Sequence, residues 1–498
     1  MAGITSLGCF LPRLRLARAT IAEAMGWLGQ GKARVKGEIA TCNWDEDSLT
    51  LGVEAARIAL AGAPSSDLDS LVFASTTAPF ADHANGVVLA TALGLNTSLR
   101  VSDTGGSQRA GTSALAAALA LPGHGLARAA ARAAGDRGTP CLVVASDQRL
   151  ARPGSPQELQ YGHGATAALV GSGAGLAEFV GAEHLAADFV DHYRESGASF
   201  DYALEDRWVR EAGWNPLVSQ TVGRLLGRLG LQAAQIDRVV LACPAATARG
   251  VLKATGLRAE ALVPDRTGEF GDIGCGHPLL LLATALESAA AGEHVLVIGF
   301  GQGVDAILLR ATGQGQAGGF GLAEAAAARR EETHYTRFLS HQGLLPVEFG
   351  MRAERDNRTA QTVAWRKHEV VTGFTGGRCR QCGALQFPLS RVCVAPDCRE
   401  TDTQEPLRLA ELPARIKTFT EDWLAYSARP PLVYGNAQFE AGGNVFMEFT
   451  DFAPGEARVG GPVRFMFRIK DLDSRRGVRR YVWKAAPGLA RGPGTRHQ

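Results

Sequence analysis

The stretch VSDTGGSQRAGTSALAAALAL, residues 101–121, runs from small and polar residues directly into a helix rich in alanine and leucine. Backbone N–H groups at a helix start are unpaired and carry partial positive charge, so a side chain there is well situated to handle an acyl carbonyl or a developing oxyanion. Ser107, Gln108 and Arg109 occupy this place, and none of them is an activated nucleophile on its own. Taken alone, the pattern favours a plain strand-to-helix connection, so the rest of the chain must decide.

The composition bounds the size and the class of the protein. Its 498 residues are enough for two or three domains with a large core. Lysine and arginine number 52 against 50 acidic residues, which argues against a dominant field for nucleic acid or for a membrane surface. We therefore expect no nucleic-acid and no membrane partner.

Targeting signals and cysteine usage point to one compartment. The first residues, MAGITSLGCFLPRLRL, show no basic region followed by a long apolar run, and no later segment is apolar for the length of a membrane span. Nine cysteines fall into five isolated residues and one tight cluster, which suits a reducing compartment better than a disulfide framework. We expect a cytoplasmic protein.

Residues 4–310 alternate short β-rich runs with alanine- and leucine-rich helices, which favours a layered α/β domain. DRVVLAC (237–243) echoes DSLVFAS (69–75), and HVLVIGFGQG (294–303) echoes CLVVASDQR (141–149). An echo at a separation of about 150 to 170 residues suggests two similar βα halves packed as one domain.

The duplication places the loop around Asp272 opposite the loop around Gln108, so a site at the junction would draw residues from both halves. Residues 45–61 open with acidic side chains and keep an apolar face, as an N-capped amphipathic helix does. Residues 186–214, between the halves, are rich in charge and aromatics. They are interpreted either as a cap over a pocket or as a solvated surface helix.

A cysteine cluster is the strongest local signal in the chain. Cys379-x2-Cys382 precedes Cys393-x4-Cys398, and Gly383 follows the first pair where a tight turn needs a glycine. Two turns that each carry two thiolates can close a tetrahedral structural zinc site, and all four positions being cysteine leaves no place open for water. A redox dithiol and uncoordinated thiols are the alternatives.

Five short β-rich segments follow the cluster, the count of a small β-barrel of the OB type. They are PARIKTFTED (413–422), PLVYGNAQFE (431–440), NVFMEFTDF (444–452), VRFMFRIKD (463–471) and RRYVWKAAP (479–487). Basic residues around Arg475–Arg480 beside Tyr481 leave three interpretations of this hairpin: a single-strand binding surface, a solvated edge, and a groove for an anionic CoA tail.

Several stretches together resemble 3-hydroxy-3-methylglutaryl-CoA (HMG-CoA) synthase of the archaeal type, over roughly residues 3–347. They are NWDEDSLTLGVEAAR (43–57), ASTTAPFADHANGVVLATALG (74–94), QRAGTSALAAALAL (108–121), ASDQRLARPGSPQELQYGHGATAALVGSG (145–173) and YTRFLSHQGLLP (335–346). The resemblance implies the thiolase fold, with duplicated βα halves layered α-β-α-β-α, shared with ketoacyl-ACP synthase III. It also implies a homodimer formed through this domain and a CoA thioester as substrate or ligand.

Residues from about 374 onward resemble the zinc-ribbon and OB-fold proteins that accompany thiolases. We therefore expect four parts: a thiolase-like domain (1–315), a connector (316–373), a zinc ribbon (374–405) and an OB-fold domain (406–498). This resemblance also implies a possible thiolase-family partner.

The chain departs from the synthase family at each catalytic position. Gln108 stands where the family has its nucleophilic cysteine, Ala242 where it has a histidine, Asp272 where it has an asparagine, and Thr76 where it has a glutamate. Because an amide cannot form the acyl-thioester, covalent catalysis by the family's route is excluded unless another cysteine substitutes. Cys243 and Cys275 would be the candidates, by proximity in the alignment.

Other candidate residues follow from the same resemblance. His277, in a glycine-histidine-proline triplet like that of thiolases, is the alternative to Asp272 as a catalytic group. Lys253 falls where the family keeps a lysine near the CoA phosphates, with Arg249 as a weaker companion, although both also suit an exposed helix. Tyr161 and His163 lie in a glycine-rich loop that reaches toward the active site in this fold, where either can move a proton or serve a structural role.

Two hypotheses from different classes result. The first is a thiolase-superfamily enzyme that cleaves or forms a C–C bond on a CoA thioester by a non-covalent route, of aldol, retro-aldol or decarboxylation type. In it Gln108 holds the thioester carbonyl, and Asp272, His277, Tyr161 or His163 transfers a proton. The second is a catalytically silent subunit that binds acyl-CoA or partners a thiolase. Ordinary Claisen condensation with a relocated cysteine is a further alternative.

Overall fold

The computed structural model describes residues 2–28, 35–61, 68–120, 140–172, 175–315, 319–356, 358 and 360–488. The chain divides into two compact units. Unit 1 comprises Met1–Asn43, Asp47–Ala90 and Leu95–Gln342, and unit 2 comprises Trp44–Glu46, Thr91–Gly94 and Gly343–Gln498. Each unit is described by itself.

A nine-stranded sheet runs through unit 1 in the order β11-β12-β13-β8-β1-β7-β6-β4-β5. Its strands are β1 (Ala2–Phe10), β4 (Ser70–Ala74), β5 (Arg100–Thr104), β6 (Cys141–Gln148), β7 (His163–Ser172), β8 (Ala177–Ala186), β11 (Arg238–Leu241), β12 (His294–Phe300) and β13 (Gly303–Ala311). A smaller sheet joins β14 (Arg330–Glu332), β2 (Leu14–Ala17) and β3 (Glu38–Thr41), and β9 (His192–Tyr193) pairs with β10 (Tyr202–Ala203).

The strand order confirms the predicted duplication. Outward from the centre it reads β1-β7-β6-β4 on one side and β8-β13-β12-β11 on the other, and the central strands β1 and β8 pair at Gly3↔Glu178 and Ile4↔Ala177. In the first half β4 and β6 pair in parallel, and in the second half their counterparts β11 and β12 also pair in parallel. The edge strand β5 has its counterpart in a single bridge, Val239↔Leu262.

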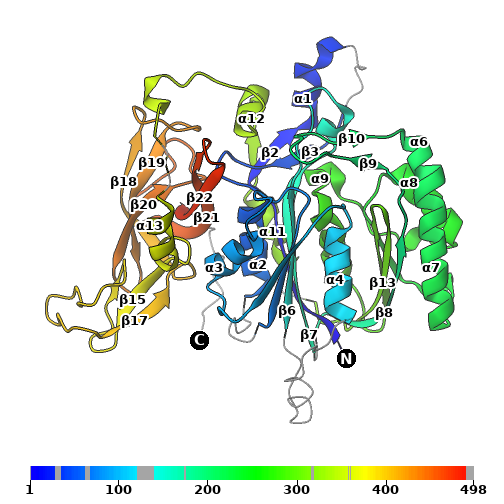
Figure 1. Ribbon diagram of the computed structural model, residues 1–498, viewed down its shortest axis with the longest axis horizontal. Coiled ribbons are helices and arrows are strands. Elements are labelled where there is room, and N and C mark those ends of the chain that lie inside the picture. The colour runs from blue at the N-terminus through cyan, green and yellow to red at the C-terminus, as the bar shows by residue number, and fades with distance from the viewer. Residues whose placement is uncertain are drawn as a thin grey trace, which may run out of the picture. The chain divides into compact units, whose positions relative to one another are not determined.

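Two helices lie between the halves and complete the layers. Helices α4 (Ala110–Ala120) and α10 (His277–Glu287) contact each other and strands of both halves, while α2 (Ser48–Ala59) covers β1, β6 and β7, and α7 (Asn215–Leu229) covers β8 and β13 (Figure 1). Leu279–Leu282 of α10 are fully buried, as expected of a helix enclosed on all sides. The succession α2, half-sheet, α4 and α10, half-sheet, α7 is the expected α-β-α-β-α arrangement.

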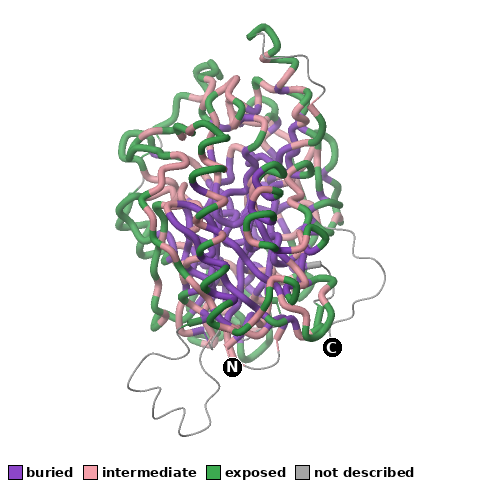
Figure 2. The backbone as a smooth tube through the Cα atoms, turned by 90° about the vertical axis from the view of Figure 1, so that its right-hand side faces the viewer, coloured by how far each residue is buried: buried purple, intermediate pink, exposed green. Residues whose placement is uncertain are grey.

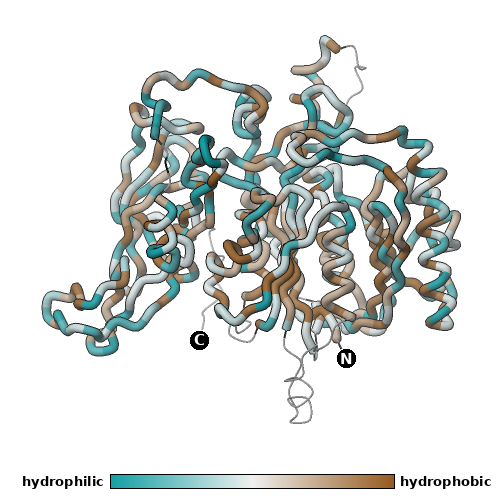
Figure 3. Tube along the Cα trace, viewed as in Figure 1, coloured by the Kyte–Doolittle hydropathy of each residue, from teal (hydrophilic) through white to brown (hydrophobic). Residues whose placement is uncertain are grey.

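Local chemistry explains where these elements start. The Asp47 side chain accepts hydrogen bonds from the backbone N–H of Leu49 and Thr50, and the Thr50 hydroxyl accepts one from the Asp47 N–H, so a capping box opens α2. Hydrophobic residues concentrate along the strands that flank α4 (Figure 3), and buried residues fill the interior of unit 1 (Figure 2). Leu121, the last residue of the opening stretch, lies outside the described residues.

The other helices of unit 1 are short, apart from α8. Helix α8 packs against α7 in the outer layer of the second half. These other helices are α1 (Arg18–Ala24), α6 (Asp206–Trp208), a π-helix (Val209–Trp214), α8 (Ala245–Thr255), α9 (Thr267–Phe270), α11 (Leu322–Ala327) and α12 (Tyr335–His341); α3 (Asn85–Leu93) contributes its last residues to unit 2. Part of the expected connector, up to Gln342, therefore folds as part of unit 1. No described helix is long and apolar enough to span a membrane.

Unit 2 contains a small sheet, a closed barrel and two short helices, α13 (Gln361–Arg366) and α14 (His368–Val371). The small sheet has the order β16-β15-β17, and the barrel has the order β18-β19-β20-β22-β21. The strands are β15 (Thr375–Cys379), β16 (Leu385–Gln386), β17 (Gln404–Arg408), β18 (Ala414–Asp422), β19 (Leu432–Phe439), β20 (Asn444–Phe449), β21 (Pro462–Asp473) and β22 (Val478–Pro487). The five-stranded barrel is confirmed, and its assignment to the OB type stays a prediction.

Candidate active site

A cavity of about 680 Å³ opens in unit 1 where strands and loops of both halves end. Four of the predicted site residues line it: Gln108 before α4, Tyr161, Asp272 and His277. Arg149, which follows β6, lines it as well. The structure thus brings together the loops around Gln108 and Asp272, which lie in different halves.

Gln108 is held by a hydrogen bond at the cavity wall. Its amide Nε2 donates to Thr76 Oγ1 at 3.1 Å, which leaves the second N–H of the amide and its oxygen for a ligand. The next residue, Arg109, fixes the start of α4 by donating to the Gly301 carbonyl at 2.8 Å and to Asp305 Oδ1 at 2.9 Å. Gln108 therefore sits at the positive end of a helix whose position is set by the opposite half.

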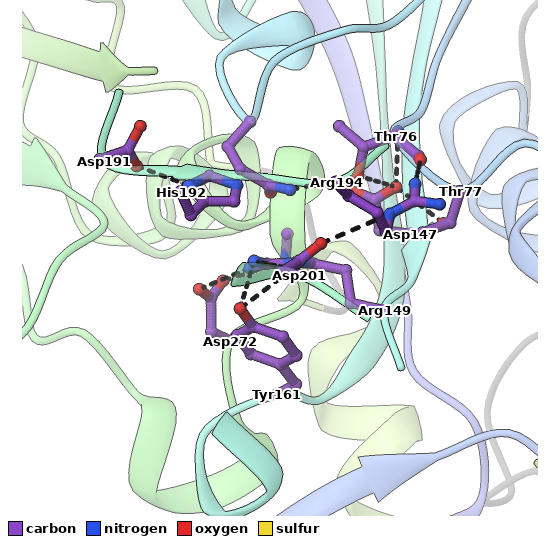
Figure 4. A network of polar contacts seen from close by, with 12 residues as sticks. Thr76, Thr77, Asp147, Arg149, Tyr161, Asp191, His192, Arg194, Asp201 and Asp272 are labelled. Carbon is purple, nitrogen blue, oxygen red and sulfur yellow. Dashed lines mark hydrogen bonds and ion pairs between the residues drawn. The ribbon is translucent and has the colours of Figure 1, made fainter. Parts of the chain in front are cut away.

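Asp147 lies beneath Gln108 and was not predicted as a site residue. It is fully buried, and its Oδ1 accepts hydrogen bonds from the hydroxyls of Ser75, Thr76 and Thr77 and from the Thr76 backbone N–H (Figure 4). Its Oδ2 accepts from the backbone N–H of Cys275 at 2.9 Å. One carboxylate thus joins β6, the loop after β4 and the turn before α10, and it fixes the Thr76 hydroxyl that holds Gln108. The signal in the sequence was an acidic residue near the end of a buried, β-rich run.

A second polar cluster surrounds Arg149. Its guanidinium Nη2 donates to Tyr161 Oη at 2.5 Å and to Asp201 Oδ2 at 2.7 Å, and its Nη1 lies 3.6 Å from Asp272 Oδ2 (Figure 4). The Tyr161 hydroxyl in turn donates to Asp201 at 3.1 Å. A backbone bridge between Tyr161 and Asp272 brings the two halves into contact. Arg149 and Asp201 were missed because only the fold brings the segment 186–214 over this loop.

Burial and pairing set the protonation of this cluster. Burial raises the pKa of Tyr161 above its ordinary value, so the phenol stays protonated and serves as a hydrogen-bond donor. Burial alone raises the pKa of Asp201 too, but the paired Arg149 outweighs it and holds the pKa below the ordinary value. Asp272 is the more accessible carboxylate, since 41% of its side chain is exposed. Asp272 is therefore the group of the cluster best placed to exchange a proton with a ligand.

Both candidate histidines are engaged by the backbone. His163 Nδ1 accepts from the Cys42 N–H at 2.9 Å and Nε2 faces the Arg149 carbonyl at 3.1 Å, and burial lowers its pKa to about 4. His277 Nδ1 accepts from the Ile273 N–H at 3.2 Å and Nε2 faces the Asp265 carbonyl at 2.9 Å. In both rings Nδ1 is therefore the acceptor and Nε2 the donor, as this set of partners requires. Of the two, only His277 lines the cavity.

The two candidate cysteines differ in exposure, since Cys243 is partly buried and Cys275 is fully buried. Burial raises the pKa of both Cys243 and Cys275 well above the ordinary value. Cys243 lines the cavity, whereas Cys275 is fully enclosed and its sulfur donates to the Ala74 carbonyl at 3.3 Å. Neither carries the thiolate that a nucleophile needs.

The expected CoA-binding residues lie elsewhere on the surface. Lys253 and Arg249 are on the exposed face of α8, and neither is among the residues that line the cavity. Their assignment to CoA stays a prediction.

The four clustered cysteines of unit 2 converge. The sulfur atoms of Cys379, Cys382, Cys393 and Cys398 all lie within 4.8 Å of one another, with 3.8 Å between Cys379 and Cys398 and 3.5 Å between Cys382 and Cys393. A tetrahedral metal with bonds of about 2.3 Å places its sulfurs about 3.8 Å apart, so this set fits a four-thiolate metal site. Gly383 has a φ of +76°, the left-handed turn expected after the first pair.

Comparisons with known proteins agree with this architecture. Hydroxymethylglutaryl-CoA synthase of Pyrococcus furiosus is 27% identical over 307 residues, which are 60% of this chain and 83% of the relative; that of Aeropyrum pernix is 29% identical over 309 residues, 61% and 82%. A crystal structure of HMG-CoA synthase complexed with CoA matches with a TM-score of 0.59 at 17% identity, covering 72% of this chain and 95% of that one. No family model matches the sequence.

A second solved structure gives the same answer. The 3-oxoacyl-(acyl carrier protein) synthase III of Pseudomonas aeruginosa has a TM-score of 0.52 at 21% identity and covers 62% of this chain and 98% of its own. The larger part of this chain is similar in sequence to HMG-CoA synthases and has the thiolase-like fold of these solved structures. The resemblance seen in the sequence is confirmed at that level, and the identification of the zinc ribbon stays a prediction.

Proposed function

We propose that unit 1 binds a CoA thioester and catalyses C–C bond cleavage or formation without a covalent cysteine intermediate. One observation carries the proposal: a positioned amide, Gln108, faces the same cavity as an accessible carboxylate, Asp272, and a protonated phenol, Tyr161. The solved relatives complexed with CoA or with 3-hydroxy-3-methylglutaryl-CoA support the ligand class.

The chemistry is written for retro-aldol cleavage of a 3-hydroxyacyl thioester. Asp272 accepts the proton of the 3-hydroxyl, the bond between C2 and C3 breaks, and its electron pair forms the thioester enolate while C3 becomes a carbonyl. The free N–H of Gln108 and the positive end of α4 stabilise the enolate oxygen. The proton then returns to C2 from Asp272, so that atoms and charge balance. Aldol addition is the reverse sequence.

The state of the thiols supports a non-covalent route. A nucleophilic cysteine is activated by a lowered pKa or by an adjacent base, whereas burial raises the pKa of Cys243 and Cys275. The described partners of Cys275 are a backbone carbonyl and the Asp147 network, and an acidic neighbour disfavours a thiolate further.

Claisen condensation of the HMG-CoA synthase type is the second candidate, because the relatives at 27% and 29% identity carry that name. It would require Cys243, the cysteine among the residues lining the cavity, to take an acyl group. A catalytically silent subunit that binds acyl-CoA and partners a thiolase is the third. The departures at the positions of Gln108, Ala242, Asp272 and Thr76 favour it.

For unit 2 we propose a structural zinc held by the four cysteines, in a ribbon followed by an OB-type barrel that serves the same acyl-CoA chemistry. Supporting this, the thiolate set has the right size and the barrel has five strands. We also propose that the protein forms a homodimer through unit 1, which light scattering of the purified protein tests.

The deciding experiment incubates purified protein with a panel of CoA thioesters, including 3-hydroxyacyl and 2-carboxyacyl esters, and follows products by mass spectrometry. Cleavage or decarboxylation without an acyl adduct is expected. Condensation products with an adduct on Cys243 would establish the Claisen reaction instead. Binding without turnover, in the presence and absence of a thiolase partner, would establish the silent subunit.

A further inference from the structure

Four aromatic rings stand in a continuous row beside the cavity. Trp214 stacks on Phe300 with ring centroids 4.1 Å apart, Phe300 meets Phe189 edge-on at 6.3 Å, and Phe189 stacks on Trp208 at 4.5 Å. The inner two, Trp214 and Phe300, line the cavity, while Trp208 at the outer end is 44% exposed. Stacked rings of this kind hold one another in place, so the cavity has a rigid aromatic wall.

Polar and apolar side chains both line the cavity. Gln108, Arg149, Tyr161 and Asp272 form part of the polar lining described above, and charged residues of the segment that leads into α7, such as Asp206 and Arg210, line it too. The apolar wall comes from the second half and from the same segment; it consists of Leu204, Val209, Trp214, Ala242, Ile298 and Phe300. The proposed reaction uses none of these six residues.

Two residues of this wall lie on a helix with an unusual winding. Val209–Trp214 form a π-helix between α6 and α7, and both end residues of this turn line the cavity. π-helical turns are rare and occur frequently at functional sites, because they re-aim side chains of an otherwise regular helix. Gly213, within the turn, lets Phe189 approach so closely that a Cβ there would lie 2.3 Å from the ring. The close approach at Gly213 therefore couples the π-helical turn to the row of aromatic rings.

The size of the cavity exceeds the needs of a short acyl group. An apolar cavity of about 150 Å³ is enough to hold benzene, and the present cavity measures about 680 Å³. Apolar walls of this extent gain affinity by removing apolar ligand surface from water. A two-carbon acyl group offers little apolar surface to such a wall.

We infer that the substrate is a CoA thioester with a bulky, ring-bearing apolar acyl group, which packs against Trp214 and Phe300 while its thioester lies at Gln108. This inference rests on the proposed function. It assigns Trp214, Phe300 and Val209 as specificity-determining residues for the acyl group.

Calorimetric binding of acetyl-CoA, phenylacetyl-CoA and free CoA tests the inference. Phenylacetyl-CoA is expected to bind at least about tenfold more tightly than acetyl-CoA, since burying one ring is worth more than 1.4 kcal/mol. Trp214→Ala is expected to lose about tenfold in affinity for phenylacetyl-CoA and to leave acetyl-CoA unchanged. Trp208→Ala is the matched control, because it shortens the same row of rings at its solvent end, and it should alter neither affinity.

Val209→Trp gives an independent measurement should Trp214→Ala unfold. The larger side chain occupies space at the apolar wall. The affinity for phenylacetyl-CoA is therefore expected to fall at least about tenfold, while the affinity for acetyl-CoA is unchanged. Equal affinities of the wild-type protein for acetyl-CoA and phenylacetyl-CoA would overturn the inference and leave CoA binding intact. If none of the three ligands binds, the proposed function fails as well, so the two failures are distinguishable.

Discussion

Gln108, which the resemblance sets at the place of a nucleophile, has the chemistry of a hydrogen-bond donor. If its free N–H meets a thioester oxygen that becomes enolate-like, Gln108→Ala weakens the transition state more than the ground state, by about 2.7 to 4 kcal/mol, the scale of a lost oxyanion donor. Turnover should therefore fall about a hundredfold or more while the Kd for the CoA ester changes little, which steady-state kinetics and calorimetry together measure.

The control for Gln108 is its partner. Thr76→Val removes the hydroxyl that accepts from Gln108 Nε2 and keeps the side-chain shape, so a smaller loss is expected, of the order of 1 kcal/mol in the activation free energy. Cleavage of a CoA ester at a rate unaltered by Gln108→Ala would remove Gln108 from the mechanism and direct attention to Asp272 and His277.

The thiols of unit 1 are expected to stay unacylated. Because burial keeps Cys243 and Cys275 protonated, intact-mass measurement after incubation with acetyl-CoA should show no added acetyl group. Cys243→Ser should accordingly retain turnover. A covalent acetyl group that peptide mapping locates at either cysteine would restore the Claisen reaction.

His163 makes the stability of unit 1 depend on pH. Its folded pKa of about 4 lies below the ordinary 6.5, so the unfolded chain binds the proton more tightly and the free energy of unfolding falls as pH drops from 6.5 to 4. The loss levels off below pH 4 and amounts to a few kcal/mol, on the order of 3. Denaturant titrations across this window should show a flatter dependence for His163→Gln, which cannot titrate. An equal slope in both proteins would contradict the assignment.

At the scale of elements, a buried carboxylate fixes the helix that carries Gln108. Asp305 is 1% exposed and accepts from Arg109 at 2.9 Å and from Ser113 at 2.6 Å, which ties α4 to β13. Asp305→Ala leaves the partly buried Arg109 charge without its partner and should lower the free energy of unfolding by about 3 to 5 kcal/mol in chemical denaturation. Asp69→Ala, which breaks the exposed pair with Arg100, is the matched control and should cost less than about 1 kcal/mol.

The elements were predictable where one local pattern decides them. The strands of the barrel and the echo between β4 and β11 follow from alternation and from apolar runs, and α2 follows from its acidic start. The site was predictable only in part. Gln108 and Asp272 were singled out because the resemblance sets them where the family has other residues, whereas Asp147, Arg149 and Asp201 join the candidate site only through contacts between segments far apart in the chain. Sequence spacing carries no signal for such contacts.

The structure of the segment 186–214 was also not predictable from its sequence. Its charges and aromatics left a cap and a surface helix equally open, and it contributes to both: Trp214 and Leu204 line the cavity, while Trp208 is 44% exposed. A one-residue change in winding, as in the π-helix Val209–Trp214, re-aims every following side chain. Periodicity in the sequence cannot show that change.

At the scale of the whole molecule, the two units depend on different stabilising principles. Unit 1 has a large apolar core around α4 and α10, which needs no metal. The small sheet of unit 2 has only three short strands, and its four cysteines lie where a metal would join their turns. Short strands without a large core commonly depend on a metal for folding, so the zinc should matter for this module alone.

The metal prediction follows from that difference. Elemental analysis of undenatured protein should find one zinc per chain, because four thiolates at these distances match its tetrahedral coordination. Cys379→Ser should lower the zinc content and make residues around 374–405 sensitive to proteolysis and rapid in amide exchange, while unit 1 retains its protection. Cys141→Ser, which removes a thiol of unit 1 that is not one of the four clustered cysteines, is the control and should keep the full zinc content. Native protein that contains no zinc would contradict the metal site. If Cys379→Ser unfolds unit 1 together with the cysteine module, the two do not fold as separate modules.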